Sequence, residues 1–460
     1  MVCGFLQKGV AFISTPIFTR IMTENEYGRY TVYNSWYSIL TIVITLNLAA
    51  GVYTRGLIKF EKDQDAFSSS MLGLSTTVII IFSLIYGVFH NFFNDLFGIS
   101  SFLMILMLLE IWSNEAYLFW SNRERVAYKY KKIVALTFAF AILRPLMGII
   151  GVLNVKENLQ VEARVSATVL VNLVLFVGLF IAILKKGKKV IDLKYWKYAL
   201  KFNIPLLPHY LSQIILSQSD KLMINHYCGT EEAAFYGVAY SLAMIMLVFN
   251  NSVSATMNPW IYRSIKNKQH EKIANVSYPI ICIIAILNLF VLALAPELLS
   301  ILAPSTYNSA LWVIPPLILN VYFMFLYNLF ATFEYYFEKT AFIMIASVLA
   351  AAANIVLNMI FIPKYGFVAA GYTSLACYII YAAAHYLFMR YVCKKYIGDK
   401  PIYNLAIIII IALVFMIMAT TMVLLFNYPI VRFSLLLIGA IVLFLIKDKI
   451  ISIFSKLKQN

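Results

Sequence analysis

Carboxylates and an arginine stand inside long apolar stretches of this sequence, where charge is costly. They are Glu110, Glu115, Arg144, Asp220 and Glu334. A charged group in hydrocarbon is expected to face a protein interior or a watery cavity, and such groups mark ion and proton pathways. The four carboxylates are therefore candidates for coupling a transport step to an ion.

Glu110 and Arg144 are predicted to lie at the same depth. They occupy consecutive antiparallel segments joined by a loop centred near residue 127, which places both near the middle of the membrane. A buried pair of opposite charges lowers the desolvation cost of each partner. Two interpretations stay open: a structural ion pair, or a pathway pair in which Glu110 takes up a proton or cation once substrate engages Arg144.

A polar stripe runs along the apolar segment 201–225. Viewed down the helix axis, its members lie within about 120° of one another. Its members are Pro205, His209, Gln213, Ser217 and Asp220. A weaker stripe further along the chain contains Asn320, Tyr327 and Glu334. Hydrogen bonds between helices could explain such stripes. A cavity lining is favoured for the first, because a proline-broken helix with His and Asp is costly for packing alone.

Apolar helices are the elements that position these residues. The sequence is 62% apolar and 13% charged, with a mean hydropathy of +0.82, far above the values typical of soluble proteins. A spanning helix needs about 20 apolar residues. We therefore predict an all-α polytopic membrane protein with about fourteen crossings. The segments are approximately 3–19, 30–53, 68–89, 99–121, 133–153, 161–184, 201–225, 234–258, 273–295, 309–331, 341–362, 366–389, 402–426 and 430–446.

The basic residues predict the orientation. Alternate loops, with Lys8 and the C-terminal tail, hold 29 of the 37 lysines and arginines, and the opposite side holds seven. Cytoplasmic loops retain such residues, so both ends are predicted to be cytoplasmic. The net charge of +16 is then a signal of topology, and no nucleic-acid partner is expected.

The basic stretch 185–201 is predicted to be a cytoplasmic linker between two six-helix lobes. The lobes would comprise residues 1–190 and 191–395, and they would form a parallel repeat because both begin on the same side. Residues 396–460 would add two helices and a cytoplasmic tail. These last two segments carry no ionisable group in their cores, which indicates a functional body of twelve helices with two peripheral ones.

Motifs for soluble chemistry are absent from the sequence. It lacks the phosphate-binding, dinucleotide-binding, zinc-protease and hydrolase signatures, and the predicted outward loops reach only about a dozen residues. The five cysteines are isolated and show no metal spacing. We expect no cofactor, no metal and no enzymatic activity, and transport is the function that remains.

Residues 8–36, KGVAFISTPIFTRIMTENEYGRYTVYNSW, contain an E-Y-G-x-Y turn after a helix that ends in a proline and a basic residue. A glycine and an arginine, Gly51 and Arg55, follow in GVYTRGLIKFEKD. A P-x-x-P helix later reaches Asp220 and Lys221. In these features the chain resembles bacterial polysaccharide-biosynthesis flippases, the Wzx-like branch of the multidrug/oligosaccharidyl-lipid/polysaccharide (MOP) exporter superfamily.

The resemblance implies a MATE/MOP-like two-lobed bundle of 12 transmembrane helices plus two peripheral ones, in the bacterial inner membrane. Its expected substrate is an undecaprenyl-diphosphate-linked oligosaccharide, moved from the cytoplasmic to the outer leaflet for O-antigen, capsule or a similar glycan. Arg55, Arg144 and Arg263 are candidates to bind the diphosphate. His209, Gln213 and Asn320 are further candidates for binding substrate. A polysaccharide polymerase and glycosyltransferases would be partners.

Three alternatives stay open. Two share the fold: a multidrug exporter and a flippase for the peptidoglycan precursor. A drug exporter of this superfamily would be expected to carry an acidic coupling residue in the first lobe, often on the first helix, where this chain has only Lys8. The third is a membrane scaffold for glycan synthesis that transports nothing.

Overall fold

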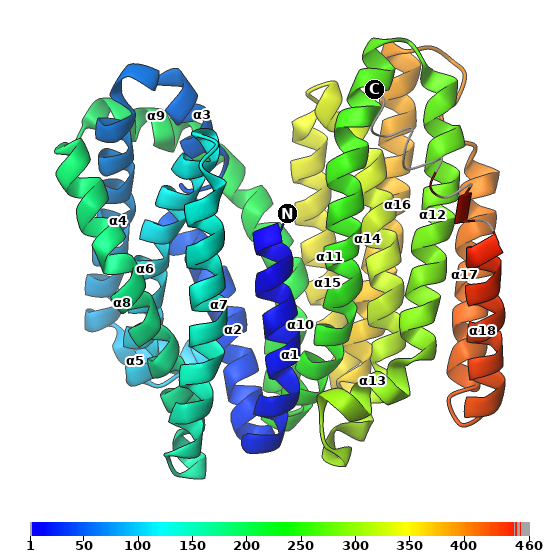
Figure 1. Cartoon of the computed structure of the whole chain (residues 1–460), viewed down its shortest axis with the longest axis horizontal. Coiled ribbons are helices and arrows are strands. Elements are labelled where there is room, and N and C mark those ends of the chain that lie inside the picture. Colours follow the sequence, from blue (N-terminus) through cyan, green and yellow to red (C-terminus); the bar gives the residue numbers. More distant parts are fainter. Residues whose placement is uncertain (1, 446, 449–450, 452–460) are drawn as a thin grey trace. The chain divides into compact units, whose positions relative to one another are not determined.

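A computed structural model of the chain describes residues 2–445, 447–448 and 451, and the side chains at all of these positions except 2–8, 11, 442 and 443. This part of the chain forms eighteen α-helices and four 3-10 helices, without a strand (Figure 1). The all-α prediction is confirmed. The side chain of Lys8 and the tail residues Lys449, Lys456 and Lys458 lie outside the described part.

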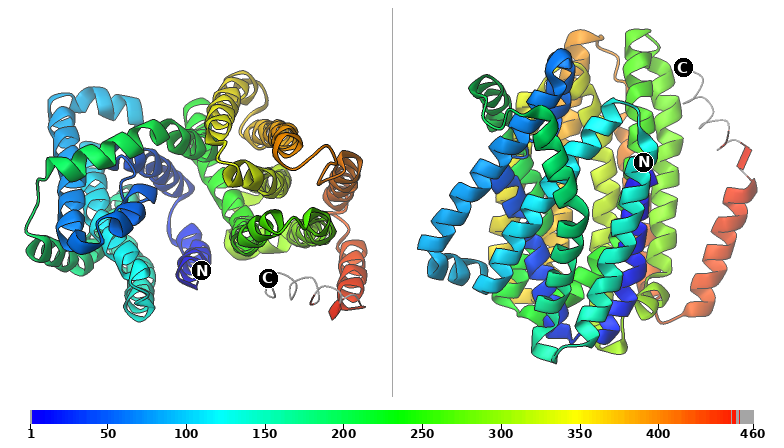
Figure 2. Two further views of the ribbon diagram at one scale, coloured as in Figure 1. Left: turned by 90° about the horizontal axis from the view of Figure 1, so that it is seen from above. Right: turned by 60° about the vertical axis from the view of Figure 1, so that its left-hand side comes forward.

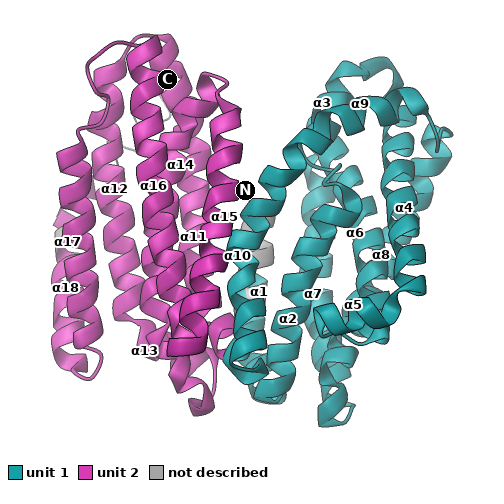
Figure 3. Ribbon diagram, turned by 180° about the vertical axis from the view of Figure 1, so that it is seen from behind, with its two compact units in different colours: residues 1–234 teal, residues 235–460 magenta. Residues whose placement is uncertain are grey.

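Two compact units divide the chain after Ala234 (Figure 3). The helices of the first unit are α1 (Val2–Ile21), α2 (Glu24–Thr45), α3 (Gly51–Lys59), α4 (Gln64–Val88), α5 (His90–Phe97), α6 (Ser101–Val126), α7 (Tyr130–Leu153), α8 (Gln160–Gly187), α9 (Leu193–Asn203) and α10 (Leu207–Tyr227). Its short 3-10 helices are η1 (Glu61–Asp63), η2 (Glu157–Leu159) and η3 (Ile204–Leu206).

The second unit begins within α11 (Thr230–Lys266). Its other elements are α12 (His270–Ala293), α13 (Ala295–Leu302), η4 (Ser305–Trp312), α14 (Ile314–Tyr336), α15 (Thr340–Tyr365), α16 (Val368–Tyr396), α17 (Leu405–Leu424) and α18 (Pro429–Leu445).

Each of the fourteen predicted segments overlaps one of the long helices. Ten of these helices are long and apolar enough to cross a membrane: α4, α6, α7, α8, α11, α12, α14, α15, α16 and α17. The chain is therefore a multi-pass membrane protein. Fourteen crossings stay a prediction, because α1, α2, α10 and α18 do not meet the same criteria within the described residues.

The predicted second segment, 30–53, is not one helix. α2 ends before Leu46, whose left-handed backbone has φ of 51°, and α3 begins at residue 51. Asn203 Nδ2 donates to the carbonyl of Leu46, and Asn122 Nδ2 donates to that of Ala49 at 2.6 Å. Backbone groups released by a break inside a membrane protein need such partners. Hydropathy does not reveal the break, because both asparagines lie far away in the sequence.

The predicted linker 185–201 is largely helical. α8 continues to Gly187, and α9 occupies most of the remainder and packs on α3 and α4. Because α10 packs on α2, both α9 and α10 belong to the first unit. The compact units therefore divide after residue 234, whereas the lobe boundary at 190 and the internal repeat stay predictions.

α17 and α18 lie at the edge of the second unit, as predicted for peripheral helices (Figure 2). α17 packs on α12 and α14, and α18 packs on α12. Arg432 fixes the start of α18: it is 1% exposed, donates to the carbonyl of Ala293 at 2.8 Å and pairs with Glu297. A guanidinium so placed avoids the cost of an unpaired charge in the bilayer.

The E-Y-G residues at the start of α2 connect this helix to the start of α8. The buried carboxylate of Glu26 pairs with Arg29 at 2.6 Å and accepts the N–H of Val161 at 3.0 Å. Arg29 also pairs with Glu162 at 2.7 Å. These bonds join the start of α2 to the start of α8. The motif residues therefore hold the first unit together.

We expect Gly28→Ala to destabilise the protein by about 1–3 kcal/mol through overpacking. A Cβ at Gly28 would lie 1.9 Å from the carbonyl oxygen of Thr230, where α11 begins. Gly178→Ala is the matched control, because nothing lies within 4 Å of its added Cβ on α8. Thermal unfolding of the two purified variants checks the difference, and equal melting temperatures would contradict it.

Candidate functional site

Arg144 and Glu110 lie on neighbouring helices of the first unit but do not form the predicted ion pair. Glu110 Oε2 on α6 instead accepts from the hydroxyl of Tyr33 at 2.9 Å. Arg144 Nε on α7 donates to Asn172 Oδ1 on α8 at 2.7 Å. None of the described ion pairs joins the two charges.

Unused hydrogen-bond donors remain beside Arg144. Its Nη2 and the Nδ2 of Asn172 are buried and have no partner among the described residues. The guanidinium carbon lies 4.5 Å from the ring centroid of Phe140 and 5.8 Å from that of Phe176, so aromatic rings cover the cation. Two adjacent donors without acceptors, one of them cationic, form an arrangement that can bind an anion.

The polar cluster extends towards α4 and α2. Glu115, which is 2% exposed, accepts from the hydroxyl of Ser75 at 3.0 Å. Tyr37 on α2 stacks on Tyr33, with their ring centroids 6.5 Å apart. Two predicted coupling carboxylates and one predicted binding arginine thus share one region of the first unit. The sequence analysis missed Tyr33 and Tyr37, whose i, i+4 spacing in an apolar segment was an available signal.

A second pair of titratable groups is buried in the second unit. Glu334 on α14 and His385 on α16 have fully buried side chains, and His385 Nδ1 lies 2.8 Å from Glu334 Oε1. The other two polar atoms, Glu334 Oε2 and His385 Nε2, have no described partner. The rings of Tyr381 and Phe342 lie 4.5 and 5.6 Å from that of His385. A buried pair of this kind can hold or exchange a proton.

Asparagines connect α15 and α16 in the same unit. Asn354 Nδ2 donates to Ser374 Oγ at 2.9 Å, Asn358 Nδ2 donates to Asn354 Oδ1 at 3.3 Å, and Thr373 donates to Asn358. All four side chains are buried. Asn320 on α14 belongs to neither group, and its buried Oδ1 has no hydrogen-bond partner among the residues that the structure describes. It therefore remains a candidate for binding substrate.

The stripe on α10 is only partly accessible. His209 and Gln213 are half-buried, whereas Asp220 is 4% exposed. Beside it, the buried Lys221 donates to Gln218 Oε1 at 3.0 Å, and this oxygen also accepts a hydroxyl hydrogen bond from α2. The lower part of the stripe thus contributes to packing between α10 and α2. His209, Gln213 and Ser217 are the half-buried polar members of the stripe.

Arg55 and Arg263 are both exposed. The guanidinium of Arg55, on α3, lies 5.2 Å from the ring centroid of Phe202 on α9. Arg263 lies near the end of α11, in the other unit. The first unit therefore does not bring Arg55 into the cluster around Arg144. The described residues contain no cluster of His, Cys, Asp and Glu that could hold a metal.

Comparisons with known proteins agree with this architecture. The sequence model of the family described as "Polysaccharide biosynthesis protein" matches residues 1–265, and that of the MatE family matches residues 205–360. A curated relative, Lsg locus protein 1 of Haemophilus influenzae, is 24% identical over 282 residues. That match covers 57% of this chain and 64% of the relative's length.

Solved structures share the fold at low identity. The lipid II flippase MurJ in its inward closed conformation has a TM-score of 0.70 at 15% identity, with 98% of this chain and 99% of MurJ covered. An inward-facing multidrug resistance MATE transporter has a TM-score of 0.65 at 12% identity, with 85% and 96% covered. A MOP superfamily transporter from Pyrococcus furiosus gives 0.57, also at 12% identity, with 85% and 94% covered.

The fold is that of the MOP exporter superfamily, a class of multi-pass transporters and flippases. Because the first sequence model covers more than half of the chain, the protein belongs to the polysaccharide biosynthesis protein family. The resemblance stated from the sequence motifs is confirmed.

Proposed function

We propose that the protein moves an undecaprenyl-diphosphate-linked oligosaccharide from the cytoplasmic to the outer leaflet for the synthesis of a surface polysaccharide. The observation that carries this proposal is the pair of buried donors on Arg144 and Asn172 that find no acceptor in the described part of the chain. A diphosphate presents several acceptor oxygens, and a guanidinium binds them with charge-assisted hydrogen bonds. Arg55 and Arg263 would bind the same headgroup at other stages of its passage.

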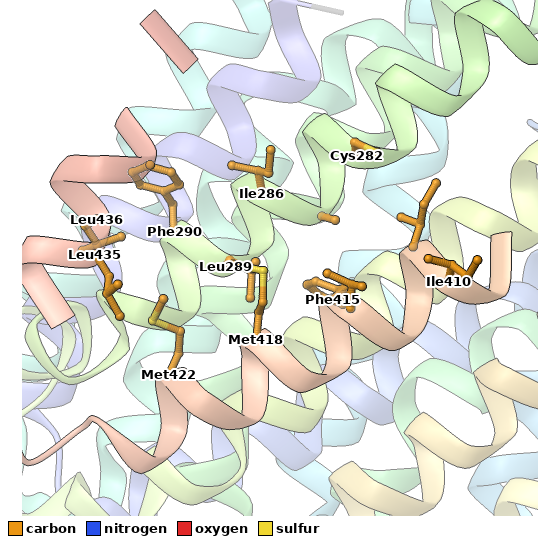
Figure 4. A pocket seen from close by; sticks show the side chains of 14 residues that line it. Cys282, Ile286, Leu289, Phe290, Ile410, Phe415, Met418, Met422, Leu435 and Leu436 are labelled. Carbon is orange, nitrogen blue, oxygen red and sulfur yellow. The ribbon is translucent and has the colours of Figure 1, made fainter. Parts of the chain in front are cut away.

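An apolar groove in the second unit supports a substrate with a long lipid chain. Its volume is about 430 Å³, and it lies between α12, α17 and α18. Phe290, Met418, Met422 and Leu436 point into it with other apolar side chains (Figure 4). Burying hydrocarbon against such a lining is favourable by about 25 cal/mol per Å² where water would otherwise be contacted. The peripheral helices would thus guide the lipid tail while the sugars pass through the protein.

A flippase for the peptidoglycan precursor is the first alternative, supported by the structural likeness to MurJ. Its substrate carries the same lipid diphosphate, so the donors on Arg144 and Asn172 suit both. A multidrug exporter is the second, supported by the MatE match. It fits less well, because α1 contains no aspartate or glutamate. A scaffold without transport activity is the third.

Coupling to an ion is proposed for the half-buried Glu110 and for the buried carboxylates Glu115, Glu334 and, on α10, Asp220. The protein would act in the bacterial inner membrane with both termini in the cytoplasm, as its basic loops indicate. A polysaccharide polymerase and glycosyltransferases would act beside it, supplying and consuming the lipid-linked oligosaccharide.

Transport by purified protein in liposomes tests the function. We expect a membrane-impermeant quencher to reach the fluorescent undecaprenyl-diphosphate oligosaccharide of both leaflets in vesicles that contain the protein, and only that of the outer leaflet in vesicles without it. In cells without the protein, the lipid-linked oligosaccharide should accumulate in the inner leaflet and the surface glycan should be lost. Changed resistance to cationic drugs with intact surface glycan would favour the exporter, and vesicles without any transport would favour the scaffold.

A further inference from the structure

One face of α9 is fixed to the first unit. Tyr195 is 2% exposed, and its ring centroid lies 5.0 Å from that of Phe60 and 5.4 Å from that of Phe67. Trp196 Nε1 donates to the carbonyl of Ser70 on α4 at 3.0 Å. These contacts with α4 and with the segment after α3 hold the helix in one rotational setting. The opposite face, which carries Leu193, Lys197 and Ile204, must therefore point away from the bundle, and the half-buried Trp196 lies at the border between the two faces.

That opposite face is an apolar stripe interrupted by two lysines. A groove of about 650 Å³ runs along it, lined by Leu193, Trp196, Lys197, Leu200, Lys201 and Ile204, with Pro205 at its end. Leu193 is 74% exposed and Ile204 is 51% exposed. Large aliphatic side chains on the outside of a membrane protein are expected to contact lipid.

Positive charge dominates this face. Neither Lys197 nor Lys201 has an acidic partner among the described ion pairs, and no carboxylate lines the groove. The nearest acid in the sequence, Asp192, caps α9 by accepting the N–H of Lys194 and lies 3.8 Å from Lys189. Residues 185–201 contain seven lysines in all. The stripe therefore offers two unpaired cations directly beside exposed hydrocarbon.

The position of α9 in the chain places it at a membrane surface. The apolar part of α8 ends at Leu184, and α10 begins the next predicted crossing at residue 207. A helix between two crossings, with leucine, tryptophan and lysine on one face, has the composition of an interfacial helix. Lysines just outside a spanning helix attract anionic lipids.

We propose that the exposed face of α9 binds anionic phospholipids of the bilayer, with acyl chains on Leu193, Leu200 and Ile204 and the headgroup phosphate between Lys197 and Lys201. The lysines lie one helical turn apart and so can contact one phosphate together. Bilayer lipid is favoured over the transported substrate because, apart from Trp196, the side chains that line the groove are aliphatic or basic. The indole N–H of Trp196 is already donated to the carbonyl of Ser70 and is not offered to a sugar.

Trp196 provides a reporter for the test because it lines the groove. The full-length protein is placed in nanodiscs that contain brominated phosphatidylglycerol or, at the same mole fraction, brominated phosphatidylcholine. The difference in fluorescence between wild type and Trp196→Phe isolates this residue from the other five tryptophans. We expect quenching by brominated phosphatidylglycerol to be at least about twofold stronger, because each lysine should raise the affinity for anionic lipid about fivefold.

Variants of Lys197 and Lys201 test whether these two charges cause the preference for phosphatidylglycerol. Lys197→Gln with Lys201→Gln should remove the affinity advantage of both lysines, so quenching by brominated phosphatidylglycerol should fall to the level of brominated phosphatidylcholine, and quenching by phosphatidylcholine should stay unchanged. Lys131→Gln with Lys132→Gln, an exposed pair outside the groove, should change neither. If Trp196→Phe fails to fold, native mass spectrometry of wild type and the lysine variants measures the retained phosphatidylglycerol instead.

Three results would overturn the proposal. Equal quenching by the two lipids in the wild type would remove the preference itself. A preference that survives in the Lys197 and Lys201 variant would assign it to another surface. Displacement of phosphatidylglycerol by undecaprenyl diphosphate at low mole fraction, or by inorganic phosphate, would assign the groove to the substrate or to a soluble anion. None of these measurements depends on transport activity.

Discussion

Arg144→Gln should lower the initial rate of lipid-linked oligosaccharide translocation in liposomes about 100-fold. The change removes charge-assisted hydrogen bonds to the diphosphate, each of about 1.5–3 kcal/mol, and tenfold corresponds to about 1.4 kcal/mol. It breaks no ion pair, because no carboxylate is bonded to Arg144. The amount of folded protein should therefore stay within about twofold of wild type. Arg125→Gln, at an exposed arginine at the end of α6, is the control and should transport normally.

Asn172→Asp tests whether Arg144 binds the diphosphate or only stabilises the fold. A carboxylate there would accept from Arg144 Nε and could also reach Nη2, which lacks a partner. The variant should fold at least as well as wild type, yet it should translocate poorly because the internal carboxylate competes with the diphosphate. A well-folded Asn172→Asp variant with normal transport would show that Arg144 has a purely structural role.

Glu110→Gln should not rescue Arg144→Ala. Glu110 accepts a hydrogen bond from Tyr33 and forms no ion pair with Arg144. Removing the arginine therefore leaves Glu110 with its partner, and neutralising Glu110 restores nothing. Restored surface glycan in the double variant would instead point to a structural pairing of the two charges. Whole-cell glycan staining, normalised to the membrane level of each variant, distinguishes these results.

The helices could be predicted from sequence because the bilayer imposes length and apolar composition on each crossing. Hydropathy averaged over about 20 residues does not resolve two local features. The prediction therefore joined α2 and α3 across the turn at Leu46, and it assigned the amphipathic α9 to a linker. Both depend on side chains from distant segments: Asn122 and Asn203 at the turn, and Phe67 under α9.

The helices that carry the candidate site could be predicted, but the rotation of each helix could not. Equal distance from a loop placed Glu110 and Arg144 on neighbouring helices, and they do belong to one cluster. The spacing does not say which way each helix is turned, so Tyr33 and Asn172 as the actual partners were not foreseen. The pairing of Glu334 with His385 was missed for a different reason. α14 and α16 are not consecutive, so no spacing rule connects them.

Loss of either member of the Glu334 and His385 pair should have the largest effect on stability in the second unit. Both side chains are fully buried, and removing one partner of a buried pair typically costs about 3–5 kcal/mol. Glu334→Ala should therefore greatly reduce the yield of folded protein. Glu334→Gln keeps a hydrogen bond to His385 Nδ1 and should fold, so its transport can be measured.

The folded Glu334→Gln variant tests whether this pair exchanges the coupling proton. A glutamine cannot bind and release a proton, so an imposed proton gradient should no longer accelerate translocation, while the slow rate without a gradient should persist. Glu338→Gln, at an exposed residue just beyond α14, is the matched control and should keep the response. Liposomes with an acidic or neutral interior give both rates for each variant. An unchanged gradient response in Glu334→Gln would assign the pair to structure alone and leave Glu110, Glu115 and Asp220 as the coupling candidates.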